Sequence, residues 1–107
     1  PAYSGGKAAV SNFTEWLATY MSKAGVRVNA IAPGFLVTKQ NEKLLLNEDG
    51  SYTARSQKII NATPMERFGD PEELIGAVLF LADAQYSSFV SGVVLPIDGG
   101  FHAYSGV

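Results

Sequence analysis

Apolar residues recur every three or four positions in two parts of the chain, and each recurrence predicts a helix. The first helix is expected over residues 4–24, with Ser4 as its N-cap and Gly25 in the left-handed position that ends it. The apolar positions that share one face of this helix are Val10, Phe13, Leu17, Tyr20 and Met21.

The second helix has a well-marked start. Asp70 is followed by Pro71 at the first helical position and by Glu73 at the third, which is the pattern of a capping box with an N-terminal proline. The helix should end near Asp83. Its expected apolar stripe consists of Leu74, Ala77, Val78 and Leu81.

Two short, nearly continuous apolar runs, Val26–Ala32 and Val93–Ile97, are typical of strands covered on both faces in a parallel sheet. Residues 35–64 are irregular, with short helices expected at Glu42–Leu46 and Thr53–Asn61. The order helix, strand, loop, helix, strand predicts an α/β fold, the C-terminal part of a doubly wound (Rossmann-type) parallel sheet.

Composition narrows the possible functions. The 107 residues are 47% hydrophobic and 17% charged, with a formal net charge of −2 and no cysteine. Without a basic excess, the electrostatic footprint of nucleic-acid binding is missing. Without cysteine, thiolate catalysis and zinc–sulfur sites are excluded, and no apolar run approaches the roughly 20 residues of a membrane span. We therefore expect a cytoplasmic protein that binds no metal, nucleic acid or membrane.

Tyr3 and Lys7 are the first candidates for chemistry. They are four residues apart at a helix start, so both side chains should project from one face. A tyrosine has a reference pKa of about 10, and a nearby ammonium group favours its phenolate form. Such a pair could exchange a proton with a hydroxyl or carbonyl oxygen. Taken alone, the same spacing also fits an ordinary amphipathic helix.

Four segments, in order, closely resemble the short-chain dehydrogenase/reductase family. They are Tyr3–Val10 (YSGGKAAV), Arg27–Gly34 (RVNAIAPG), Pro64–Glu73 (PMERFGDPEE) and Ser91–Gly100 (SGVVLPIDGG). The resemblance implies an oxidoreductase that transfers hydride between NAD or NADP and a small-molecule substrate.

The resemblance also assigns roles to single residues. Tyr3 matches the tyrosine that exchanges the proton, and Lys7 matches the lysine that lowers the tyrosine pKa and hydrogen-bonds the nicotinamide ribose. The loop that begins at Pro33 and Gly34 matches the nicotinamide site, where the backbone of Leu36 meets the carboxamide and Thr38 contacts the carboxamide or the pyrophosphate.

Several parts of the family pattern do not occur between residues 1 and 107, namely the Gly-rich turn for the pyrophosphate, the catalytic serine and the residue that discriminates NAD from NADP. The chain also opens on Pro1 rather than methionine. We therefore expect residues 1–107 to be the C-terminal portion of a single Rossmann-type oxidoreductase domain, inactive by itself. The alternative from another class is an inert fragment that serves as an interaction module.

Within the family, four segments look like the D-mannonate oxidoreductases, also called fructuronate reductases: Tyr3–Trp16, Lys39–Asn41, Asp49–Thr53 and Asp98–Phe101. This resemblance implies a sugar acid as substrate, and Lys39 becomes a candidate partner for its carboxylate. Lys39 could equally be a solvated loop lysine. A 3-oxoacyl thioester and a polyol or gluconate remain alternative substrates.

Aromatic residues suggest how the chain assembles. We expect Phe13 and Trp16 in the core or at an interface. The aromatic C-terminal segment, by the family resemblance, should pack against another subunit in a homotetramer.

Overall fold

The computed structural model describes residues 2–104, with the backbone alone at Tyr3 and Ser4. The chain forms two compact units, one from Pro1–Ala32 and Gly76–Leu95, the other from Pro33–Ile75 and Pro96–Val107. The described elements are helices and a small parallel sheet, which confirms the predicted α/β class.

The sheet has two strands, β1 (Ala30–Pro33) and β2 (Val94–Ile97). The amide of Ala30 donates to the carbonyl of Val93 at 2.9 Å, and four residues later the amide of Gly34 donates to the carbonyl of Ile97 at 3.0 Å. Because partner numbers rise together along both segments, the strands are parallel, as the apolar runs predict.

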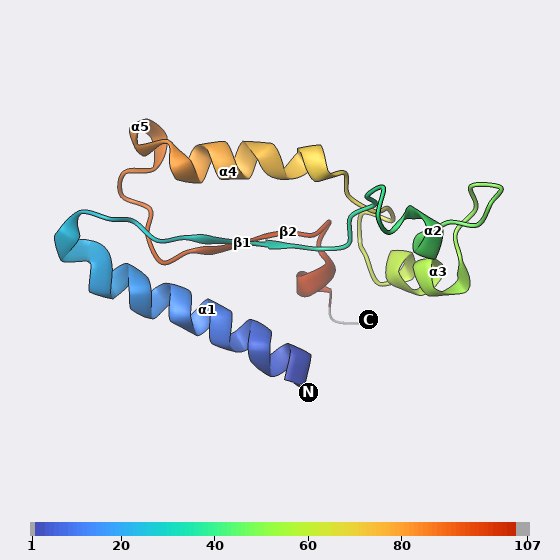
Figure 1. Cartoon of the computed structure of the whole chain (residues 1–107), viewed down its shortest axis with the longest axis horizontal. Helices are drawn as coiled ribbons and strands as arrows, with labels where there is room; N and C mark the ends of the chain where they lie inside the picture. Colours follow the sequence, from blue (N-terminus) through green and yellow to red (C-terminus); the bar gives the residue numbers. More distant parts are fainter. Residues whose placement is uncertain (1, 105–107) are drawn as a thin grey trace. The chain divides into compact units, whose positions relative to one another are not determined.

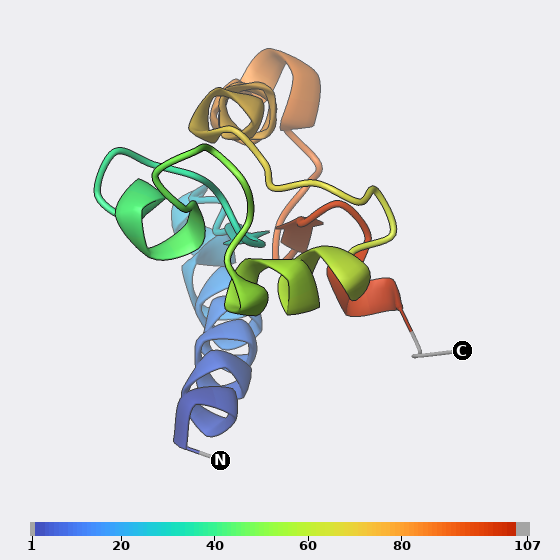
Figure 2. The same cartoon turned by 90° about the vertical axis from the view of Figure 1, so that its right-hand side faces the viewer.

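In the first unit, α1 (Ala2–Met21) and α4 (Ile75–Ala82) lie on opposite sides of the two strands (Figures 1 and 2). α1 continues into a short 3₁₀ turn, Ser22–Ala24, which ends at Gly25 with φ 74°, as expected. The helix starts earlier than residue 4, so the expectation that Ser4 is its N-cap is wrong. Tyr3 and Lys7 are consequently both on continuous helical backbone.

The face that α1 turns inward differs from the expected stripe. Thr14 and Ala18 are buried on it, and a Cβ built on Gly92 would lie 3.6 Å from the Cβ of Ala18. Small residues on this face let the helix approach the segment that leads into β2. Val10 and Tyr20, both assigned to the inner stripe, are 59% and 68% exposed.

Large aromatic residues occupy the outer face of α1 instead. Phe13 and Trp16 are each 55% exposed, and their ring centroids lie 5.6 Å apart. The Trp16 ring also stacks on Tyr20 at 5.2 Å. The expectation that Phe13 and Trp16 lie in the core of this chain is therefore wrong, and the alternative, an interface, stays a prediction.

The second unit has a core of its own. Leu45 on α2 (Glu42–Leu45), Ile60 on α3 (Ala54–Asn61) and Phe68 are buried together, with Val37 and Ile59 packed against them. Both short helices agree with their predicted positions. Thr53 caps α3 by accepting a hydrogen bond from the amide of Ser56 at 3.2 Å.

The predicted capping box at Asp70 is present. The Asp70 carboxylate accepts from the Glu72 amide, and the Glu73 carboxylate accepts from the Asp70 amide at 3.0 Å. The first turn, Pro71–Leu74, is 3₁₀ before α4 begins. Two short elements follow that the apolar pattern does not predict: α5 (Ala84–Ser87) and a 3₁₀ turn at Phe101–Ala103.

Arg67 strengthens this helix start with two hydrogen bonds to the Glu73 carboxylate, at 2.7 and 2.8 Å. These bonds, together with the bond from the Asp70 amide, lower the pKa of Glu73 from 4.5 to about 2. The folded state therefore favours the ionised carboxylate. The stability that this preference gives is complete above pH 4.5 and is lost as the pH falls toward 2.

We predict that Glu73→Gln in the full-length protein lowers the thermal unfolding temperature most at pH 5 and above, because the variant cannot form the ionised pair. The gap to the wild type should narrow steadily as the pH falls from 4.5 toward 2. Scanning calorimetry across this range measures it. Glu72→Gln is the matched control, because it removes the same charge from the same turn without breaking an ion pair. A gap that is independent of pH would contradict the assignment.

Candidate functional site

The loop after β1 begins with a close backbone approach. A Cβ on Gly34 would lie 2.6 Å from the Cβ of Asp98 and 2.7 Å from its Cα. Asp98 cannot easily move away, because its carboxylate accepts from the amides of Gly100 and His102, each at 3.0 Å. Only glycine fits at position 34, which gives a structural reason for one of the predicted site residues.

Leu36 forms an isolated parallel bridge with Gly69. The Gly69 amide donates to the carbonyl of Phe35 at 2.9 Å, and the Val37 amide donates to the carbonyl of Gly69 at 3.1 Å. Backbone groups of an extended segment alternate sides, so the N–H and C=O of Leu36 point away from Gly69. The Leu36 carbonyl accepts from the Asn41 side chain at 2.8 Å. Within residues 2–104, its N–H makes no hydrogen bond.

Thr38 and Asn41 lock the end of this loop. The Thr38 amide donates to Asn41 Oδ1 at 2.7 Å, and the Asn41 amide donates to Thr38 Oγ1 at 3.3 Å. Asn41 also holds the Leu36 carbonyl, so one side chain fixes two backbone positions of the loop. The Thr38 hydroxyl hydrogen stays available as a donor in this arrangement.

A cavity of about 320 Å³ opens beside the loop, and we call it the loop cavity. Gly34, Leu36 and Thr38 line it on the strand side. Phe35 of the loop also lines it, and the other lining residues come from the following turn and from α2 and α3; they are Asn41, Leu44, Leu45, Arg55 and Ile59. This volume falls in the range of roughly 300–1,000 Å³ that is usual for small-molecule sites.

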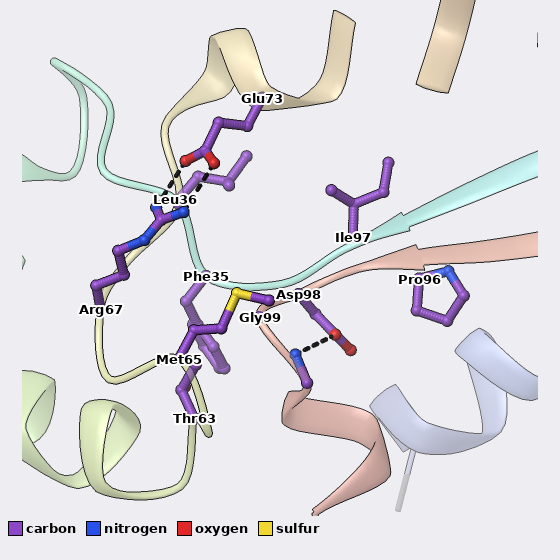
Figure 3. Close-up of a pocket in the computed structure, with 12 residues that line it drawn as sticks. Phe35, Leu36, Thr63, Met65, Arg67, Glu73, Pro96, Ile97, Asp98 and Gly99 are labelled. Carbon is purple, nitrogen blue, oxygen red and sulfur yellow. Dashed lines mark hydrogen bonds and ion pairs between the residues drawn. The ribbon is translucent and has the colours of Figure 1, made fainter. Parts of the chain in front are cut away.

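A second cavity, of about 350 Å³, lies at the ends of β1 and β2 (Figure 3). Its charged lining residues are already engaged. Arg67 faces Glu73 in the ion pair described above, and Asp98 accepts from two backbone amides. This strand-end cavity therefore offers a ligand fewer free charges than the loop cavity.

The structure brings some of the predicted site residues together. Gly34, Leu36 and Thr38 share the loop cavity, and Pro33 ends β1 directly before them. Tyr3 and Lys7 lie one turn apart on α1, in the other unit, and Lys7 is exposed. The side chain of Tyr3 lies outside the described residues.

Lys39 directly follows the loop and is exposed. It lines neither the loop cavity nor the strand-end cavity. The cation that does line the loop cavity is Arg55, which sequence reasoning missed. No local pattern marks Arg55, because its position depends on how α3 packs against the loop.

No helix within residues 2–104 is long and apolar enough to cross a membrane. The same residues include no group of three or more histidine, aspartate or glutamate side chains placed to hold a metal ion.

Comparison with known proteins identifies the class. The family model described as enoyl-(acyl carrier protein) reductase matches residues 1–102. The chain belongs to the short-chain dehydrogenase/reductase family of oxidoreductases.

Particular relatives are close. An uncharacterized oxidoreductase of Haemophilus influenzae is 66% identical over the whole chain, which covers 38% of that protein. A solved structure from the same species, assigned as a D-mannonate oxidoreductase and holding NAD, matches with a TM-score of 0.91 and 66% identity over 100% of this chain and 38% of the other.

More distant relatives include enzymes named for gluconate and its derivatives. Gluconate 5-dehydrogenase of Gluconobacter oxydans is 40% identical over 92% of this chain and 36% of its own length. An Agrobacterium tumefaciens structure assigned as a 2-deoxy-D-gluconate 3-dehydrogenase holds NADP; it matches with a TM-score of 0.80 and 35% identity over 96% of this chain and 39% of that one. The present chain thus spans well under half the length of these relatives.

We predict that Gly34→Ala destabilises the full-length protein by about 1–3 kcal/mol, the usual cost of forcing extra atoms into a packed site. Urea unfolding measures the change. Gly76→Ala on α4 is the matched control, because no atom lies within 4 Å of its added Cβ. There, alanine should be neutral or stabilising by up to about 1 kcal/mol. Equal stability of Gly34→Ala and the wild type would contradict the close approach to Asp98.

Proposed function

We propose that this chain is the C-terminal portion of an NAD(P)-dependent oxidoreductase that transfers hydride between the nicotinamide and a ketone or hydroxyl of a sugar acid. One observation carries the proposal: the backbone N–H of Leu36 has no hydrogen-bond partner among the described residues, and Leu36 and Thr38 both line a cavity just beyond the carboxyl end of β1. Cofactors of open α/β sheets bind at the carboxyl ends of the strands.

The residues present suit a nicotinamide cofactor. A carboxamide oxygen needs a donor, which the Leu36 N–H supplies, and the Thr38 hydroxyl offers a second one. When bound, the nicotinamide ring donates or accepts the hydride. The chain's own contribution would be orientation, because the bridge to Gly69 and the bonds from Asn41 hold the loop in place before any ligand arrives.

Tyr3 and Lys7 would move the proton. During reduction, the Tyr3 hydroxyl gives its proton to the carbonyl oxygen of the substrate, and during oxidation the phenolate takes the hydroxyl proton. The Lys7 ammonium, one helical turn away, would favour the phenolate and bind the nicotinamide ribose. These roles come from the family resemblance and from the continuous helix that carries both residues.

A sugar acid is the substrate class that the relatives favour. The Haemophilus protein is assigned to D-mannonate and the Gluconobacter enzyme acts on gluconate. The corresponding reaction here would interconvert D-fructuronate and D-mannonate, with Lys39 as a candidate for the carboxylate. The description of the family model, an acyl-carrier-protein reductase, keeps an acyl thioester as the alternative.

We further propose that the full-length protein works in the cytoplasm as a homotetramer. The aromatic stack of Phe13, Trp16 and Tyr20 would then be covered between subunits, as would the exposed side chains of Tyr86 and Phe89. Burial of such apolar surface is a common driving force for association.

We predict that Tyr3→Phe in the full-length protein lowers kcat for D-fructuronate reduction by roughly 10²–10⁴-fold, the usual contribution of general acid–base catalysis. Cofactor affinity should hardly change, because only the proton-transferring hydroxyl is lost. Steady-state kinetics and NADH fluorescence titration measure the two effects.

Tyr20→Phe is the matched control for this prediction. It removes the same atom near the other end of α1 but keeps the ring that stacks on Trp16, and it should leave turnover unchanged. Near-normal turnover of Tyr3→Phe would contradict the proposed role of Tyr3.

A further inference from the structure

Among the described residues, the loop cavity has one ionisable side chain in its lining, Arg55, the second residue of α3. Within the described residues, the side chain of Arg55 makes no ion pair and no hydrogen bond. Arg67, by contrast, holds Glu73 with two bonds. No carboxylate among the described residues therefore compensates the positive charge of Arg55, and the lining of the loop cavity includes no carboxylate.

The other polar groups of the loop cavity carry no charge. Thr38 and Asn41 bond to each other, and the side-chain NH₂ group of Asn41 donates to the Leu36 carbonyl. Apolar side chains, among them Leu44 and Ile59, make up much of the remaining wall. An anionic ligand in this cavity would consequently find its strongest partner in Arg55.

The backbone that carries Arg55 is firmly held. The next residue, Ser56, is fully buried, and its hydroxyl donates to the Leu45 carbonyl on α2 at 2.6 Å. The Thr53 cap fixes the start of α3, and Ile60 anchors its other end in the core. Core contact with Val37 also ties the loop to the same two helices. Arg55 and the Leu36 N–H thus belong to one packed unit.

We propose that Arg55 binds the carboxylate of the sugar acid and thereby selects an anionic substrate; this rests on the proposed function. A guanidinium group matches a carboxylate with two parallel N–H···O bonds, which gives both strength and orientation. The carboxylate at Arg55 and the nicotinamide carboxamide at Leu36 would define two ends of the occupied cavity. Lys39 is the rival candidate for the carboxylate, because it directly follows the loop. Unlike Arg55, it does not line the cavity.

The test compares D-fructuronate with D-fructose, which carries a hydroxymethyl group in place of the carboxylate. In the full-length protein, Arg55→Met should lower kcat/KM for D-fructuronate by about 10- to 150-fold, the range for a lost charge-assisted hydrogen bond. The loss should appear mainly in KM, and the activity toward D-fructose should change much less. Calorimetric titration of D-mannonate into the protein saturated with oxidised cofactor should show the same loss of affinity.

Three further variants sharpen the comparison. Arg55→Lys keeps the charge and should restore part of the affinity for D-mannonate. Lys58→Met removes a cation from the same helix without touching the cavity lining, and should behave as the wild type. Lys39→Met should lose less than Arg55→Met.

Equal losses on D-fructuronate and D-fructose would overturn the role of Arg55, as would a larger loss in Lys39→Met. Unchanged thermal unfolding and NADH affinity of Arg55→Met would show that a loss arises at the substrate and not from misfolding. A wild-type protein that neither reduces D-fructuronate nor binds D-mannonate would contradict the proposed function, and this inference with it. If the wild type reduces D-fructuronate and Arg55→Met has no effect, the role of Arg55 is contradicted while the proposed function stands.

Discussion

The backbone of Gly34 passes so close to Asp98 that no side chain fits between them, and the direction of the following loop depends on this approach. Two backbone amides hold the carboxylate of Asp98 in place, so the close approach restricts the path of the loop that follows Gly34. Once past Gly34, the chain bridges to Gly69 and then places Val37 in the core with α2 and α3. The close approach at Gly34, the bridge to Gly69 and the burial of Val37 each restrict the backbone conformation of the loop. Together they fix the orientation of the Leu36 amide.

A binding site that uses a backbone N–H gains from such rigidity. The Leu36 donor needs no side-chain rotamer to be frozen when a ligand arrives, so the ordering cost of binding falls. The same core fixes α3, which carries the cation opposite the loop. The packing of this unit, the geometry of the loop and the proposed recognition of a substrate therefore depend on one set of contacts.

The sequence predicted those features that depend on interactions between residues close together in the chain. The helix α3, the capping box at Asp70 and the strand β2 lie where the pattern put them. The strand β1 begins only at Ala30, four residues after the start of the apolar run that predicted it. The prediction of which face of α1 points inward was wrong, because apolar residues occur on both faces of the helix. Close packing against Gly92 favours the small Ala18 on the inner face. Arg55 could not be found, since its place beside the loop depends on contacts between segments far apart in sequence. Tyr3 and Lys7 were recognised by family resemblance, and their roles stay predictions.

In the proposed complex, the Leu36 N–H donates to the nicotinamide carboxamide. Residue-resolved amide hydrogen exchange of the full-length protein, with and without saturating NAD, reports on this contact at the amide itself. The Leu36 amide, which has no partner among the described residues, should exchange markedly more slowly when NAD is bound. The neighbouring Val37 amide, already bonded to Gly69, should change little and serves as the internal control. Unchanged exchange at Leu36, under conditions where NAD protects other amides, would contradict the proposed contact between this amide and the nicotinamide carboxamide.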